Sequence, residues 1–163
     1  MKKTEKREKP MTKAQEKKML KRAVNKAFDL WGEIGSLYSD FRCEYCGIAK
    51  GEIKGNGKPT VLNHHHLIVR ENHGLRFNPR NCITLDQWCH KFGREGAHRG
   101  TLIFNEWFRM NQYRGNDYYY LIDHKDDSPI ESLEDVALAV AQLYAERARL
   151  IVARLENEHT IAE

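Results

Sequence analysis

The sequence lacks any long run of apolar residues. Apolar residues make up 40% of the chain and charged residues 31%. A membrane-spanning helix needs about 20 consecutive apolar residues, and a secretory signal needs an apolar segment behind its basic start. Because the lysine-rich N-terminus has neither, we expect no membrane association and a cytoplasmic location. The sequence also lacks an internal repeat, and its 163 residues suit one ordinary domain with appendages.

Cysteine is scarce as well. The four cysteines are Cys43, Cys46, Cys82 and Cys89. In a reducing compartment, a Cys-x-x-Cys pair with histidines nearby favours zinc over a disulfide. The consecutive residues His64, His65 and His66 are difficult to explain as packing, and His90 follows the last cysteine. Histidine can act as a base or as a metal ligand near neutral pH, so we expect a metal site and a reactive site in one segment.

Acidic residues are rare at the start of the chain. Residues 1–26 carry eleven basic and three acidic residues, residues 27–124 carry twelve and eleven, and residues 125–163 carry four and nine. We interpret these segments as a basic arm that is partly disordered and partly helical, a central domain, and an acidic C-terminal helix. The arm suits a polyanion, because each neutralised phosphate releases counterions. The alternative is a solvated tail that aids solubility.

Long helices are expected at both ends. Apolar residues recur at steps of three and four after Thr12, which can cap the first helix, and Gly32 and Gly35 are expected to end it. A capping box at residues 128–131 is expected to open the last helix, which runs to about Asn157. This helix packs along the body or pairs with a second copy.

The middle of the chain is expected to alternate short strands with a loop. The pattern predicts a strand through the histidines over residues 60–69, a loop over 71–81, a strand over 83–85 and a helix from Asp86 to His90. Adjacent histidines on a strand point to opposite faces, so one can bind a metal while its neighbour faces the substrate. Further helices are expected at residues 102–110 and after a cap at Asn116.

These residues resemble the HNH endonuclease family, in particular its small phage-type members. The resemblance is carried, in order, by His65-His66-Leu67-Ile68, Asn81 and Cys89-His90, with shorter matches at Leu75-Arg76-Phe77, Ala97-His98 and residues 104–108. It covers residues 41–121. It implies an α+β fold, a ββα-metal HNH finger with a zinc knuckle, flanked by N- and C-terminal α-helices, with the nuclease domain over residues 27–124.

The resemblance also implies roles for individual residues. His66 would be the general base that activates water, and Asn81 would fix the loop between the strands by hydrogen bonding. His65 and His90 would bind the catalytic metal, and His98 would add a ligand or a phosphate contact. In a register shifted by one, His64 and His65 would take the two roles of the histidine pair. Mg²⁺ or Mn²⁺ is the expected metal, and Ni²⁺ or Zn²⁺ also suits a histidine-rich site.

The zinc knuckle departs from the family pattern at one ligand. Cys43 and Cys46 match the first Cys-x-x-Cys pair and Cys89 matches the end of the second, but Asp86 stands where the pattern has cysteine. A carboxylate can bind zinc at about 2.0–2.2 Å, so a site of three cysteines and one aspartate is expected. The alternatives are Cys82 or His98 as the fourth ligand, or cysteines that pack without zinc.

The sequence therefore predicts a metal-dependent DNA endonuclease of low sequence specificity, either of the host or encoded by a phage that acts in the host cytoplasm. By resemblance, it would leave 5′-phosphate and 3′-hydroxyl ends. The DNA backbone would contact basic side chains, namely Lys13, Lys17, Lys18, Lys21, Arg22, Arg70, Arg76 and Arg80. The alternatives are a non-catalytic zinc-finger DNA-binding protein, and a protein that recruits a partner or a second copy through its acidic C-terminal helix.

Overall fold

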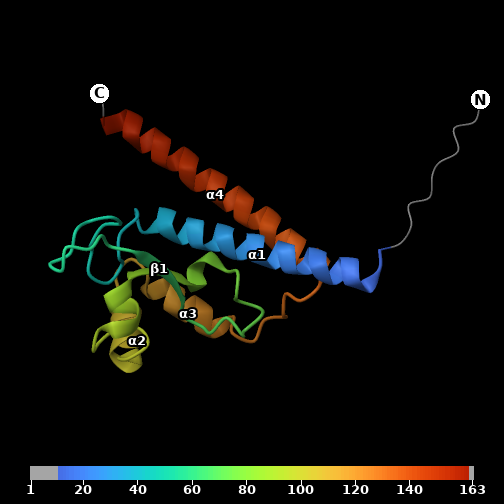
Figure 1. Ribbon diagram of the computed structural model, residues 1–163, viewed down its shortest axis with the longest axis horizontal. Helices are drawn as coiled ribbons and strands as arrows, with labels where there is room; N and C mark the ends of the chain where they lie inside the picture. Colours follow the sequence, from blue (N-terminus) through green and yellow to red (C-terminus); the bar gives the residue numbers. More distant parts are fainter. Residues whose placement is uncertain (1–10, 162–163) are drawn as a thin grey trace, which may run out of the picture.

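The computed structural model describes residues 11–161, and Figure 1 shows their arrangement. The helices are α1 (Lys13–Tyr38), α2 (Thr101–Met110), α3 (Gly115–Asp123) and α4 (Leu133–Ile161), the strands are β1 (Leu62–His66) and β2 (Cys82–Asp86), and the short turns are η1 (Pro79–Asn81) and η2 (Trp88–Phe92). This mixture of helices with one small antiparallel sheet confirms the α+β class. None of the described helices has the length and apolar character to cross a membrane. The disorder expected for the start of the chain falls on residues that lie, apart from Met11, outside the described ones.

Helix α1 begins where the sequence predicts and ends later. Thr12 caps it, and the side chain of Gln15 completes a capping box. The prediction that the helix ends at Gly32 and Gly35 was wrong, because both glycines are needed where α1 crosses the sheet. A Cβ at Gly35 would lie 2.3 Å from Cys82 Sγ, and one at Gly32 would lie 2.8 Å from the His64 ring. Close packing therefore outweighs the cost of about 1 kcal/mol for a helical glycine.

The two strands form an antiparallel ribbon in which His65 is opposite Ile83 and His66 is opposite Cys82. The second predicted strand is confirmed within β2. The first is shorter than predicted, since β1 consists of residues 62–66 and its neighbours on both sides leave the ladder. The helix expected from Asp86 is a single wide turn, η2, that begins two residues later.

Two hydrophobic cores lie on opposite faces of the ribbon, and β2 is buried along its whole length between them. One core joins α1, α4 and the loop before β2 through Ala27, Leu30, Trp31, Ile34, Phe77, Cys82, Val136, Ala139 and Leu143. The other joins the cysteine turn, β2, η2 and α2 through Cys43, Ile83, Leu85, Cys89, Ala97, Phe104 and Phe108. The ribbon therefore presents its side chains to two different environments.

Helix α4 packs along α1, in the same direction (Figure 1). Arg147 pairs with Glu33 at 2.7 Å, and about two turns beyond, Arg154 pairs with Asp40 at 2.8 Å. The prediction that this helix packs along the body of the protein is therefore confirmed. Because α1 is continuous past residue 26 and shares a core with α4, the expected boundary of the basic arm falls inside a helix.

Two predicted helix starts were wrong. Helix α4 is capped by Ser132 rather than Ser128: Ser132 Oγ accepts from Asp135 N–H at 3.0 Å, and the Asp135 carboxylate accepts from Ser132 N–H at 3.2 Å. Ser128 precedes an extended segment that is hydrogen-bonded to the loop at His73. Helix α3 starts at Gly115 and has Arg114, not Asn116, at its N-cap.

Candidate functional site

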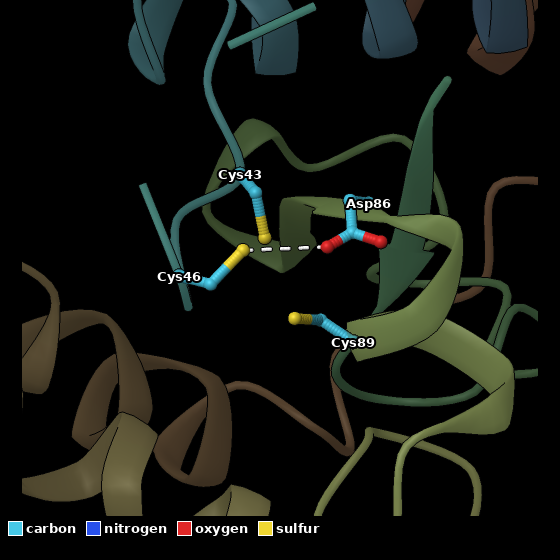
Figure 2. A group of neighbouring side chains, drawn as sticks. All are labelled: Cys43, Cys46, Asp86 and Cys89. Carbon is cyan, nitrogen blue, oxygen red and sulfur yellow. Dashed lines mark hydrogen bonds between the residues drawn. The ribbon is translucent and has the colours of Figure 1, made fainter. Parts of the chain in front are cut away.

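Three cysteines and one aspartate meet at the end of β2. Cys43 and Cys46 lie in the turn after α1, Asp86 is the last residue of β2, and Cys89 lies on η2. Their ligand atoms all lie within 4.8 Å of one another, and Figure 2 shows the four side chains directed at one centre. Gly47, with a φ of 78°, closes the turn behind the first two cysteines. The tertiary structure thus assembles the four residues that the sequence analysis grouped.

The Asp86 carboxylate is held by a residue that the sequence analysis did not single out. Lys54 Nζ lies 2.8 Å from Asp86 Oδ1, and Trp88 N–H donates to the same oxygen at 2.6 Å. Oδ2 is thereby directed at Cys46 Sγ, 3.3 Å away. Burial by itself raises the pKa of Asp86, but these hydrogen bonds lower that pKa to about 2. Asp86 is therefore an ionised carboxylate with one oxygen turned toward the sulfurs.

The three thiols strongly influence one another. A hydrogen bond from Cys89 lowers the pKa of Cys43 to about 5, while burial raises the pKa of Cys46 to about 11. Three thiolates and a carboxylate can coexist at this spacing only around a positive charge. Tetrahedral zinc uses this kind of donor set, so the four residues can hold a zinc ion.

The alternative fourth ligands lie elsewhere. Cys82 is buried against Gly35 on the α1 side of the ribbon, and burial raises the pKa of its thiol. His98 belongs to a second group, with His65 and His90. Among the described residues, Asp86 is therefore the one that completes the cysteine group.

The second group consists of three imidazoles from three parts of the chain. His65 comes from β1, His90 from η2 and His98 from the loop behind it. His90 Nε2 lies 3.2 Å from His65 Nδ1 and 3.0 Å from His98 Nε2. Burial lowers the pKa of His65 to about 3 and that of His90 to about 4. Both rings are therefore neutral at pH 7, with lone pairs that suit a borderline transition metal.

His66 points away from this group, onto helix α1. Its ring stacks on Trp31 with 3.9 Å between centroids, and Phe28 meets its edge. His66 Nε2 lies 2.9 Å from the carbonyl oxygen of Arg76. Because a carbonyl can only accept, Nε2 carries the proton and Nδ1 has a free lone pair. Burial lowers the pKa of His66, so the ring is neutral at pH 7.

His64 has a structural environment. Its Nε2 lies 2.9 Å from Ser36 Oγ, and its ring packs between the two glycines of α1. Strand alternation places His64 and His66 on one face and His65 on the other. The shifted register would need the His64 ring beside His90, but His64 lies against α1. The ring beside His90 is that of His65.

One surface cavity of about 400 Å³ joins the two histidine environments. It is lined by Phe28, His64, His65, His66, Val69, Arg70, Glu71, His90 and His98. The loop behind it is held by Asn81, which is fully buried. The Asn81 side chain donates to the carbonyls of Ile68 and Leu75 at 2.9 and 3.1 Å and accepts from Ile68 N–H at 2.7 Å. Asn81 is thus a positioning residue rather than a group on the cavity.

The basic residues expected to contact DNA are placed unequally. Arg70 lines the cavity, with its guanidinium 5.1 Å from the Phe28 ring centroid. Arg76 is half-buried and hydrogen-bonded to the carbonyl of Ile130, and Arg80 pairs with Asp117 at 3.6 Å, so neither lies on the cavity. The other five are exposed along the first half of α1: Lys13, Lys17, Lys18, Lys21 and Arg22.

Comparisons with protein-family models, curated proteins and solved structures give no match for this chain. Function is therefore inferred from the two side-chain groups and from the cavity that joins the histidine group to His66.

Proposed function

We propose that the protein is a metal-dependent DNA endonuclease with an HNH-type active site. The observation that supports this most is the arrangement around the cavity: the imidazole of His66, whose Nε2 donates to the Arg76 carbonyl, lines the same cavity as the three imidazoles of His65, His90 and His98. Hydrolysis of a phosphodiester needs a base for water and positive charge on the phosphate oxygens. The arrangement offers a residue for each requirement.

In this proposal the chain's own side chains bind the phosphate and accept one proton from the attacking water. His66 Nδ1 accepts a proton from the attacking water, while the stack on Trp31 and the bond to the Arg76 carbonyl hold the ring in place. Arg70 at the cavity rim pairs with the phosphate. His65, His90 and His98 could hold a divalent cation, which would supply charge neutralisation at the scissile phosphate. An all-nitrogen donor set favours Mn²⁺, Ni²⁺ or Zn²⁺ over Mg²⁺, which prefers oxygen.

The cysteine group has a different part in this proposal. Cys43, Cys46, Cys89 and Asp86 would hold a zinc ion, which would stabilise the end of β2 and the turn η2, which carries His90. The exposed lysines of α1 bind the DNA backbone without reading sequence. We therefore expect weak sequence preference.

The decisive experiment compares nicking of supercoiled plasmid by wild-type protein and by His66→Ala across Mg²⁺, Mn²⁺, Ni²⁺ and Zn²⁺. His73→Ala is the matched control, because His73 lies outside the cavity and pairs with Glu131. We expect the His66 variant to lose at least a hundredfold in rate, with unchanged DNA affinity in a gel-shift assay, and the control to cut normally. If the wild type binds DNA but never nicks it with any of the metals, the alternative is correct: a non-catalytic zinc-finger DNA-binding protein.

A further inference from the structure

The side of α4 that faces away from α1 carries an apolar stripe. Its members recur at alternating steps of three and four residues: Leu138, Ala141, Ala145, Ala148, Val152 and Leu155. All six are exposed, and the three larger side chains, at positions 138, 152 and 155, are 61%, 52% and 51% exposed. An outer helix of a folded protein ordinarily carries polar residues on this side. We call these six residues the outer stripe.

The outer stripe lies opposite the side of α4 that is already packed. Val136, Ala139, Leu143 and Leu150 face α1. At about 100° per residue, the centre of the outer stripe is about 180° around the helix from the centre of this packed side. Figure 1 shows α4 as an outermost element, with no other described helix or strand beyond it. A second helix can therefore approach without displacing α1.

We propose that the outer stripe pairs α4 with the α4 of a second copy of this chain, in antiparallel orientation. Steps of three and four are the spacing with which two helices pack at a small crossing angle. Read in reverse, the stripe matches itself: Leu138 meets Leu155, Ala141 meets Val152, and Ala145 meets Ala148. A two-fold interface requires each residue to meet its counterpart in this way. The small residues at the centre let the two backbones approach closely.

The flanking residues and the helix dipoles agree with the antiparallel choice. The antiparallel orientation places Gln142 beside the partner's Arg149 on one flank, and Tyr144 beside the partner's Ile151 on the other. Opposed macrodipoles also favour antiparallel neighbours. Like charges meet only at the ends of the pair, where Asp135 lies near the partner's Glu156.

The length of the stripe sets the expected strength. It extends about 26 Å at 1.5 Å per residue, so a pair of such helices buries an area at the low end of the range for specific interfaces, roughly 1,200 Å² in total. We therefore expect a dimer that dissociates in the micromolar range rather than an obligate one.

Sedimentation equilibrium of the full-length zinc-loaded protein, from about 1 to 500 μM, tests the proposal without DNA or cleavage. We expect the apparent mass to rise from the chain mass of 19.1 kDa toward twice that value. Leu138→Glu and Val152→Glu should stay monomeric at every concentration with unchanged circular dichroism. Leu102→Glu is the matched control, since Leu102 is 84% exposed on α2, and it should dimerise like the wild type. A wild type that stays at 19.1 kDa, or stripe variants that still dimerise, would overturn the proposal.

The orientation has its own test. In an antiparallel pair, Leu138→Lys on one copy faces Leu155→Glu on the other, so a mixture of the two variants should dimerise although each alone does not. A parallel in-register pair would give no such recovery, because each substitution would face an unchanged leucine. A different partner protein on this side would leave both variants and the wild type monomeric.

Discussion

The ring of His66 lies parallel to the indole of Trp31, with 14° between their planes and 3.9 Å between centroids. Trp31 Nε1–H donates to the Asn78 carbonyl at 2.9 Å, and His66 Nε2 donates to the Arg76 carbonyl at 2.9 Å. Both acceptors belong to the loop that Asn81 holds. The free Nδ1 of His66 is therefore oriented jointly by helix α1, strand β1 and this loop.

The burial of His66 leads to a prediction about pH. A general base works only when neutral, and burial lowers the pKa of His66 below its ordinary value of 6.5. Cleavage at saturating metal should therefore reach half its maximal rate at a pH below 6.5 and level off above it. Trp31→Leu should move this midpoint to higher pH, because it exposes the imidazole to water. A pH–rate profile in Mn²⁺ measures both, and a midpoint above pH 6.5 in the wild type would contradict the assignment of His66 as the base.

The contact of Lys54 with Asp86 leads to a prediction about zinc affinity. Lys54→Met removes the ammonium at 2.8 Å that keeps one carboxylate oxygen turned toward the sulfurs. Loss of such a supporting contact typically weakens metal binding about 10–100-fold, and we expect that loss here. Competition with a chromophoric chelator measures the affinity. Lys58→Met in the same loop is the matched control, and equal affinities for the two variants would show that Lys54 does not position Asp86.

An ion pair beside the zinc site leads to a prediction about stability. Glu44, inside the Cys-x-x-Cys turn, pairs with Arg114 at 2.6 Å and accepts from Thr84 N–H at 2.8 Å. Both side chains are mostly buried, and Arg114 also pairs with Asp117 at 2.6 Å, so Glu44→Gln should destabilise the protein by about 1–3 kcal/mol, the cost of weakened hydrogen bonds to a charged group. Urea unfolding measures the change. Arg114→Met should cost more than Glu44→Gln, because it removes the partner of both the Glu44 and the Asp117 carboxylates. An Arg114→Met variant that is as stable as Glu44→Gln would contradict this account.

The approach of Gly35 to Cys82 leads to a prediction about packing. Alanine ordinarily stabilises a helix relative to glycine by about 1 kcal/mol. At Gly35 we expect the opposite, a loss of about 1–3 kcal/mol, because the added Cβ would lie 2.3 Å from Cys82 Sγ. Cys82→Ala should recover most of that loss in the double variant. Thermal unfolding of the four proteins of this cycle measures the coupling, and independent effects of the two substitutions would argue against the contact.

Local sequence signals determined the parts of the fold that depend on near neighbours. The cap at Thr12, the strand around residues 83–85 and the helix at 102–110 all depend on contacts a few residues apart, and the structure contains each of them. The sequence also separated the cysteine set from the histidine set. Local sequence did not distinguish Ser128 from Ser132 as the cap of α4. The hydrogen bond between the preceding segment and His73 favours Ser132.

Tertiary structure decided what depends on distant partners. Whether α1 passes through Gly32 and Gly35 depends on how closely the sheet approaches, which no local pattern contains. The direction of the Asp86 oxygens depends on Lys54, and the tautomer of His66 depends on a carbonyl ten residues away. The identity of the reactive residue types was therefore readable from the sequence. Their orientation and protonation were not, because these follow from burial and hydrogen bonds between segments that only the folded chain brings together.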